Sequence, residues 1–260
     1  MAKAPNQLPE KKRFQRIPVR YLLPNLLTLL ALCSGVTAIR FAVEARFEIA
    51  VGAIILAIVL DALDGRLARL LKGTSRFGAE LDSLADFVNF GVAPAIMVYF
   101  WSLNSLRTFG WVVCLMLAIA CALRLARFNV ALDDPDKPAW AANYFSGIPA
   151  PAGALLALAP LYLGFLEVIN NGHDHAKVIA IYIVAIALLM VSRVPTFSGK
   201  TLTRVPREAF LPVLAGLAFG VVFLISFPWE SMVIVAGLYI VLIPLSVLSY
   251  RRRAREKPSE

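Results

Sequence analysis

Charged side chains are scarce in this chain, and cysteine is scarcer still. Asp, Glu, Lys and Arg make up 17% of the 260 residues, whereas 59% are hydrophobic and the mean hydropathy is +0.73. An ordinary soluble domain carries about 25% charged residues, so this composition is typical of a polytopic membrane protein. The three cysteines, Cys33, Cys114 and Cys121, lie in apolar runs and have neither zinc-site nor disulfide-framework spacing.

Long apolar runs occupy most of the sequence, and each approaches the ~20 residues needed to cross the hydrocarbon core. They predict an all-α, polytopic integral membrane bundle with about eight transmembrane helices. The predicted spans are residues 21–43, 47–71, 79–100, 109–130, 149–168, 177–192, 209–227 and 231–250. We expect a single transmembrane catalytic domain, residues 21–250, between basic tails at residues 1–20 and 251–260.

Lysine and arginine are distributed unevenly among the intervals between these runs. Of the 26, 22 lie in alternate intervals, and the other four are Arg40, Arg46, Arg107 and Lys177. The positive-inside rule then predicts that both termini are cytoplasmic, with the protein in the inner (cytoplasmic) membrane of the cell. The net charge of +9 could suit nucleic acid, but this distribution favours an anionic lipid surface and no nucleic-acid partner.

Four aspartates interrupt the apolar runs within 26 residues. A charged side chain at the bilayer centre costs roughly 2.5–3.5 kcal/mol on insertion scales, so four carboxylates require compensating cations or a function. The defined positions of the pattern are Asp61, Asp64, Gly65, Ala68, Arg69, Gly78, Asp82 and Asp86. Their helical spacing places the first five on one face and the last three on another. In an antiparallel hairpin at ~1.5 Å per residue, all four carboxylates reach a similar depth near the cytoplasmic third of the membrane.

Converging carboxylates repel one another unless a cation lies between them. Hard divalent cations, particularly Mg²⁺ or Mn²⁺, prefer such oxygen ligands, and two of them suit phosphoryl transfer. Gly65 and Ala68 remove side-chain bulk beside the aspartates, and Arg69 offers a planar fork for phosphate. Two alternatives remain open. The aspartates could form a structural network with Arg66, Arg69 or Arg76, or a proton relay in a transporter, which would need carboxylates spread across the full membrane depth.

At every defined position the pattern resembles the signature of the CDP-alcohol phosphotransferases. The resemblance implies an enzyme that displaces CMP from a CDP-linked lipid or alcohol, using an alcohol acceptor and two divalent metal ions. It implies metal binding by Asp61, Asp64, Asp82 and Asp86, with Asp86 also acting as the general base. It implies CDP binding by Gly65, Ala68, Arg69, Gly78 and Asn25. Members of this family typically have a six-helix core, to which this chain would add two helices, and form homodimers.

Four further segments resemble one branch of the family, the membrane-embedded phosphatidylserine synthases: residues 24–28, 124–129, 145–151 and 192–200. This resemblance implies CDP-diacylglycerol and L-serine as substrates. The residues expected to bind the acceptor or the diphosphate are Arg124, Arg127, Asn129, Arg193 and Lys200. The same cations could instead set the topology and contact lipid headgroups. Glycerol-3-phosphate or an inositol phosphate would need a second phosphate site, and choline would favour an aromatic cage.

Overall fold

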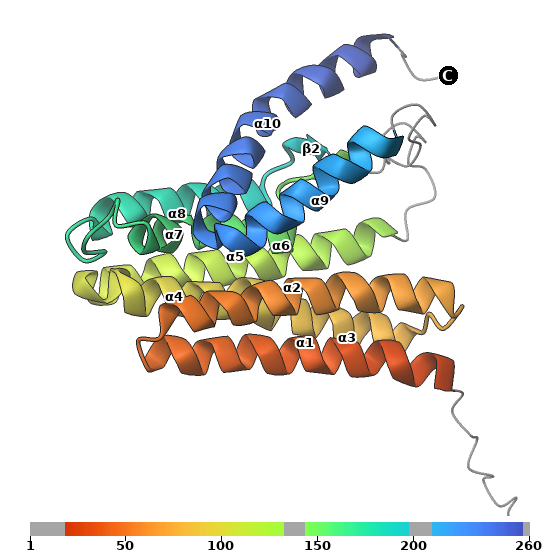
Figure 1. Cartoon of the computed structure of the whole chain (residues 1–260), viewed down its shortest axis with the longest axis horizontal. Coiled ribbons are helices and arrows are strands. Elements are labelled where there is room, and N and C mark those ends of the chain that lie inside the picture. The colour runs from red at the N-terminus through yellow and green to blue at the C-terminus, as the bar shows by residue number, and fades with distance from the viewer. Residues whose placement is uncertain (1–18, 133–143, 198–209, 257–260) are drawn as a thin grey trace, which may run out of the picture.

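The computed structural model describes residues 19–132, 144–197 and 210–256, which are almost entirely helical (Figure 1). The longer helices are α1 (Val19–Val43), α2 (Phe47–Leu70), α3 (Arg76–Asp86), α4 (Ala93–Trp101), α5 (Thr108–Leu132), α8 (Ala176–Val191), α9 (Phe210–Ser226) and α10 (Pro228–Glu256). The shorter ones are η1 (Phe87–Val92), η2 (Leu103–Leu106), α6 (Ala150–Ala157) and α7 (Ala159–Phe165). Two short strands are also present, β1 (Tyr144–Ser146) and β2 (Pro195–Phe197).

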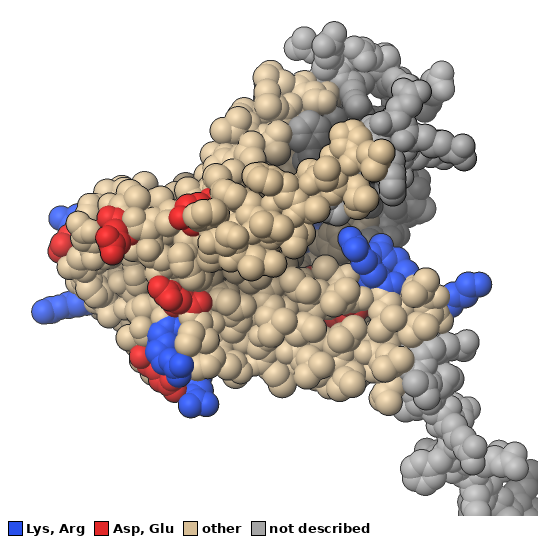
Figure 2. Space-filling model, viewed as in Figure 1, with Lys and Arg blue, Asp and Glu red and all other residues tan. Residues whose placement is uncertain are grey.

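Each of the eight predicted spans coincides with one helix or with consecutive helical segments. Four stretches are long and apolar enough to cross a membrane: Leu22–Val43, Arg76–Trp101, Thr108–Ala131 and Pro228–Tyr250. Three shorter apolar helices are Ala150–Phe165, Ala176–Val191 and Leu211–Ser226. The described chain is therefore that of a helical integral membrane protein. Lys and Arg gather toward the two ends of the bundle in Figure 2, while most of the visible flank is uncharged, as a lipid-facing surface requires.

The structure differs from the sequence prediction at the end of α10, in the two short strands and in the π-helical turn η1. The helix α10 continues through the basic residues beyond 250 to Glu256, because arginine has a high helix propensity and needs no apolar surroundings. An all-α prediction also omits the strands, which pair antiparallel with Phe145 opposite Thr196. Next to β1, Gly147 has φ +77°, a conformation that ends regular structure and favours glycine.

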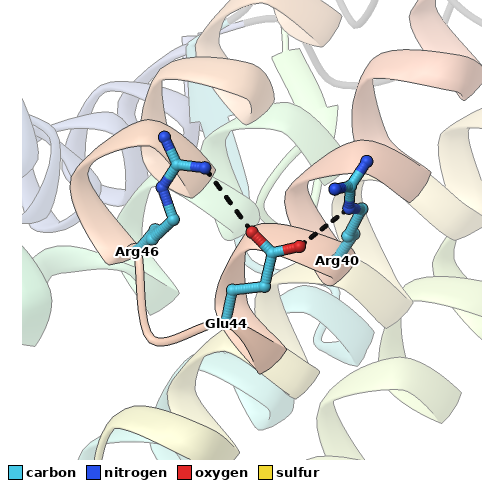
Figure 3. Close-up of polar contacts among 3 residues, drawn as sticks. All are labelled: Arg40, Glu44 and Arg46. Carbon is cyan, nitrogen blue, oxygen red and sulfur yellow. Dashed lines mark hydrogen bonds and ion pairs between the residues drawn. The ribbon is translucent and has the colours of Figure 1, made fainter.

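The first two helices form an antiparallel hairpin that sets the position of the aspartates. At its turn, Glu44 accepts from Arg40 at 2.8 Å and pairs with Arg46 at 3.5 Å (Figure 3). The hydrogen bond from Arg40 lowers the pKa of the exposed Glu44 carboxyl. Further along the hairpin, the Ser34 hydroxyl donates to the carbonyl of Ala53 at 2.8 Å. This register places the C-terminal half of α2, with its two aspartates, beside the first turns of α1.

Small residues allow the core helices to approach closely. Gly35 of α1 packs against the amide of Asn89 in the π-helical turn η1, and Gly91 packs against Cys121 of α5. The core beyond them includes the fully buried Phe90 and Leu117. Packing of this kind stabilises helix association where lipid supplies little hydrophobic driving force. It holds η1 between α1 and α5, and so fixes the end of α3, the helix that carries Asp82 and Asp86.

Candidate active site

Three of the four aspartates form a single cluster. Asp61 and Asp64 on α2 and Asp82 on α3 each offer a carboxylate oxygen, and these oxygens all lie within 4.8 Å of one another. Asp86, one turn further along α3, is close enough to interact electrostatically with Asp61 and Asp82. The structure thus brings together the carboxylates that the helical spacing placed on two faces. Figure 2 shows acidic atoms through a hollow near the right-hand end of the bundle, where α2 and α3 run.

Thr28 of α1 orients one member of this cluster. Its hydroxyl donates to Oδ2 of Asp64 at 2.5 Å and also lies 3.2 Å from the carbonyl oxygen of Pro24. Both side chains are buried, with exposed fractions of 5% for Thr28 and 4% for Asp64. The sequence analysis gave Thr28 no role of its own. Its place one turn after Pro24 is a weak signal, because a hydroxyl there can equally bond the preceding turn of its own helix.

A pocket of about 160 Å³ adjoins the cluster on the side of the α2–α3 turn. It is lined by Pro24, Asn25, Thr28, Asp64, Gly65, Ala68, Gly73, Thr74, Ser75, Gly78, Ala79 and Asp82. Four of the five residues expected to bind CDP, namely Asn25, Gly65, Ala68 and Gly78, therefore share one cavity. The fifth, Arg69, is exposed, and its Nε donates to the carbonyl of Gly65 at 3.0 Å.

The two glycines of this pocket differ in what surrounds them. A Cβ atom at Gly65 would meet nothing within 4 Å, so the protein itself leaves that space open. A Cβ atom at Gly78 would lie 2.8 Å from Oδ1 of Asn25 and 3.1 Å from Oγ of Ser75. The Ser75 hydroxyl also caps α3 by accepting from the Gly78 amide at 3.0 Å. Gly65 thus leaves open space beside the cluster, whereas Gly78 allows α1 and α3 to pack.

The chemistry of the cluster fits divalent metal ions. Its donors are all carboxylate oxygens, which Mg²⁺ and Mn²⁺ prefer. Within the described ranges, no ion pair joins any of the four aspartates to a lysine or arginine, and the ion pairs present are those of Glu44. The structural network with Arg66, Arg69 or Arg76 is therefore absent from this part of the chain. Carboxylates that are gathered in this way without ion pairs repel one another, and a bound cation would relieve that repulsion.

The residues expected to bind the acceptor or the diphosphate take different positions. Arg124 is buried and its charge acts on Asp86. The Nδ2 atom of Asn129 donates to the hydroxyl of Ser83 at 2.9 Å, so the side chain of Asn129 points toward α3. Arg193 is exposed, just after α8, and Lys200 lies outside the described residues.

Arg127 is turned away from the cluster, toward the end of α8. Its Nη1 donates to the carbonyl of Val191 at 2.6 Å, and its Nη2 lies near the carbonyls of Met190, Ser192 and Ser146 at 3.3, 3.0 and 3.4 Å. Carbonyls at a helix C-terminus have no partners within the helix, and a cation there also complements the helix dipole. The contacts of Arg127 therefore stabilise the junction between α8 and β1.

Comparison of the sequence with known protein families identifies the family of this chain. The sequence model of the CDP-alcohol phosphatidyltransferases matches residues 21–243, which include every helix of the cluster and the pocket. The chain belongs to the CDP-alcohol phosphatidyltransferase family. Divalent metal ions are generally used in this family, in agreement with the donor set described above.

Three relatives of this chain share one name. It is 37% identical to the CDP-diacylglycerol–serine O-phosphatidyltransferase of Mycobacterium leprae over 93% of this chain and 79% of that protein. It is 35% identical to the Helicobacter pylori (strain 26695) protein of the same name, over 85% of this chain and 89% of the relative. A Saccharomyces cerevisiae protein of that name is 43% identical over 42% of this chain and 40% of its own length.

Proposed function

We propose that this protein is a phosphatidylserine synthase, which transfers the phosphatidyl group of CDP-diacylglycerol to the hydroxyl of L-serine and releases CMP. The observation that carries the proposal is the similarity, over 85% and 93% of this chain, to relatives named for this reaction. The structure supports it, because a carboxylate cluster and a pocket with an open glycine face lie side by side. A diphosphate substrate needs both features.

Asp61, Asp64 and Asp82 would hold two divalent ions, Mg²⁺ or Mn²⁺, with Asp86 beside them. When bound, such ions neutralise a diphosphate and stabilise charge on the leaving oxygen. The protein contributes the orientation of the ligands, since Thr28 fixes Asp64 and the α1–α2 hairpin fixes the depth of both aspartates on α2. Ligands held in this way bind more tightly because less order is lost on binding.

The remaining steps belong to the side chains around the pocket. The CDP moiety would lie against the open face of Gly65, with Asn25, Ala68 and Gly78 around it and Arg69 at the edge. A carboxylate oxygen of Asp86 would take the proton of the serine hydroxyl. The serine oxygen then bonds to the phosphorus that carries the diacylglycerol, and the bond from that phosphorus to the oxygen of CMP breaks. The products are phosphatidylserine and CMP.

The proposal includes a membrane topology. Residues 21–250 would form one catalytic domain with eight spans, between the tails 1–20 and 251–260. Both termini and the active site would face the cytoplasm from the inner membrane, and two copies would associate as a homodimer. The distribution of Lys and Arg supports this orientation, as does the direction of the helices, since α1 begins and α10 ends toward the right-hand side of Figure 1. Tags accessible only from the outside would contradict it.

The experiment that tests the function is CMP release by the purified protein with CDP-diacylglycerol and Mg²⁺ or Mn²⁺. L-serine, glycerol-3-phosphate, inositol phosphate and choline are supplied in separate reactions. Release with serine alone, abolished by EDTA, is the expected result. Release with another alcohol would keep the transfer chemistry and overturn the choice of acceptor. A folded protein that releases no CMP with any of the four would make a transporter that uses the aspartates the better account.

A further inference from the structure

Arg124 of α5 is a buried cation whose guanidinium has no hydrogen-bonding partner among the residues that the structure describes. Its exposed fraction is 8%, and neither a hydrogen bond nor an ion pair links it to any residue of the described ranges. Its contact with Phe128 is through the ring face, at 5.7 Å from the centroid. A guanidinium carries five N–H donors, and a buried charge is normally paired. Asp86 acts on this charge from a distance but accepts no hydrogen bond from it, so the N–H donors of Arg124 point to an anionic ligand.

Tyr239 of α10 places a second unsatisfied donor beside it. The Tyr239 hydroxyl is buried and has no hydrogen-bond partner among the described residues, yet it is close enough to Arg124 for the two to interact electrostatically. The hydroxyl of Thr196 lies next to that of Tyr239, but its hydrogen is used in a 2.8 Å bond to the carbonyl of Gly147, so toward Tyr239 it can act only as an acceptor. Within the described ranges the hydroxyl of Tyr162 is buried and unpartnered too, but only that of Tyr239 lies near a buried cation, and this combination points to an anionic ligand.

These two donors belong to helices other than those that carry the aspartates. Arg124 and Tyr239 come from α5 and α10, whereas the aspartates come from α2 and α3. Asp86 connects the two groups of helices, because its carboxylate interacts electrostatically with Arg124 and with Asp61 and Asp82. A small acceptor located here would have its anionic end at α5 and α10 and its hydroxyl near Asp86.

The charges around Arg124 match a carboxylate better than a phosphate. Among the described groups whose charge acts on Arg124, Arg127 is the only other cation, and its guanidinium is occupied by backbone carbonyls. One guanidinium and one hydroxyl together can serve the two oxygens of a carboxylate. A phosphate dianion would need a second cation, and the quaternary ammonium of choline would be repelled by Arg124.

We propose that Arg124 and Tyr239 form the subsite for the acceptor's carboxylate, so that the enzyme selects an amino-acid alcohol. This inference rests on the proposed function and deepens it, because it assigns the choice of serine to α5 and α10. Tyr239 is then a specificity-determining residue that lies outside the aspartate pattern and outside the four segments used to recognise the family branch.

The test is the substitution Tyr239→Phe, which removes one oxygen and keeps the ring. We expect the KM for L-serine to rise about ten-fold or more, the loss that follows from one hydrogen bond to a charged group. The kcat and the KM for CDP-diacylglycerol should stay within about two-fold of the unsubstituted protein. The matched control is Tyr162→Phe on α7, because that hydroxyl is also buried and without a partner among the described residues, yet lies in the apolar core. It should leave all three constants unchanged.

Serinamide, in which a neutral amide replaces the carboxylate, provides a second readout. The unsubstituted protein should prefer serine to serinamide strongly, and Tyr239→Phe should reduce that preference by about ten-fold. An unchanged KM for serine, an equal rise in the KM for CDP-diacylglycerol, or equal use of serinamide by the unsubstituted protein would overturn the subsite. Failure of the proposed function is a separate result, since the unsubstituted protein would then release no CMP with serine at all, and the subsite would fall with it.

Discussion

The hydroxyl of Thr28 donates a 2.5 Å hydrogen bond to Asp64, joining α1 to α2 at the edge of the carboxylate cluster. Loss of a group that orients a metal ligand typically costs 10–100-fold in metal affinity or activity. We therefore expect Thr28→Val to raise the metal concentration for half-maximal CMP release by about 10-fold or more. Thr28→Ser, which keeps the hydroxyl, should stay close to the unsubstituted protein.

The matched control for Thr28 is Thr37→Val on the same helix. The Thr37 hydroxyl is exposed and donates to the carbonyl of Cys33 at 2.6 Å, away from the aspartates. Its loss should leave the metal dependence unchanged, both in CMP release and in the thermal stabilisation that added Mn²⁺ produces. Equal shifts for the two valine variants would contradict the role of Thr28.

The open space beside Gly65 gives a second prediction. Gly65→Ala should fold normally, since the new methyl group meets no protein atom within 4 Å. It should lower kcat/KM for CDP-diacylglycerol by more than about ten-fold, because the methyl group occupies space that the nucleotide would need. Gly52→Ala, also on α2 and also without a neighbour within 4 Å, is the control and should remain fully active. Normal activity of Gly65→Ala would place the CDP moiety elsewhere.

Arg127 gives a prediction about stability rather than substrate binding. Arg127→Ala removes hydrogen bonds to carbonyls at the end of α8 and in β1, so we expect it to cost roughly 2 kcal/mol of unfolding free energy, or about 4–8 °C in midpoint temperature. The measurement is thermal unfolding in detergent, followed by size-exclusion chromatography. Arg66→Ala, at an exposed position of α2, should have little effect. A normal midpoint with a raised KM for serine or CDP-diacylglycerol would show instead that Arg127 binds substrate.

The contact between Gly35 and Asn89 predicts that an alanine at position 35 destabilises the protein, although the same change stabilises most helices. A Gly-to-Ala change inside a helix ordinarily stabilises it by roughly 0.5–1 kcal/mol. At Gly35 the added methyl group would overlap Oδ1 of the fully buried Asn89, so Gly35→Ala should lower the unfolding temperature. The same change at Gly216 of α9, where nothing lies within 4 Å, should be neutral or stabilising. A stable Gly35→Ala protein would contradict the packing of α1 against η1.

The positions of the helices and the convergence of three aspartates could be predicted from the sequence. Apolar runs gave the positions of the helices to within a few residues, because span length and hydropathy depend on neighbouring residues alone. The convergence of Asp61, Asp64 and Asp82 followed from the helical period and an antiparallel hairpin. Their roles as metal ligands stay a prediction.

Contacts between distant segments could not be predicted in this way. Three contacts depend on how helices far apart in sequence pack together. They are the hydrogen bond from Thr28 to Asp64, the hydrogen bonds from Arg127 to the end of α8, and the proximity of Tyr239 to Arg124. Periodicity does not encode that arrangement. The π-helical turn after Asp86 and the two short strands were missed for the same reason, since tertiary packing overrides local preference there.

The most direct test of the account follows isotopically labelled L-serine into lipid. Purified protein is incubated with CDP-diacylglycerol, Mn²⁺ and labelled serine, and the organic phase is counted beside the CMP released. We predict equal amounts of labelled lipid and CMP, with neither formed when EDTA is added or when Asp82 is replaced in Asp82→Asn. Labelled lipid formed at the normal rate by folded Asp82→Asn protein would contradict the claim that the carboxylate cluster of α2 and α3 is the centre of phosphatidyl transfer.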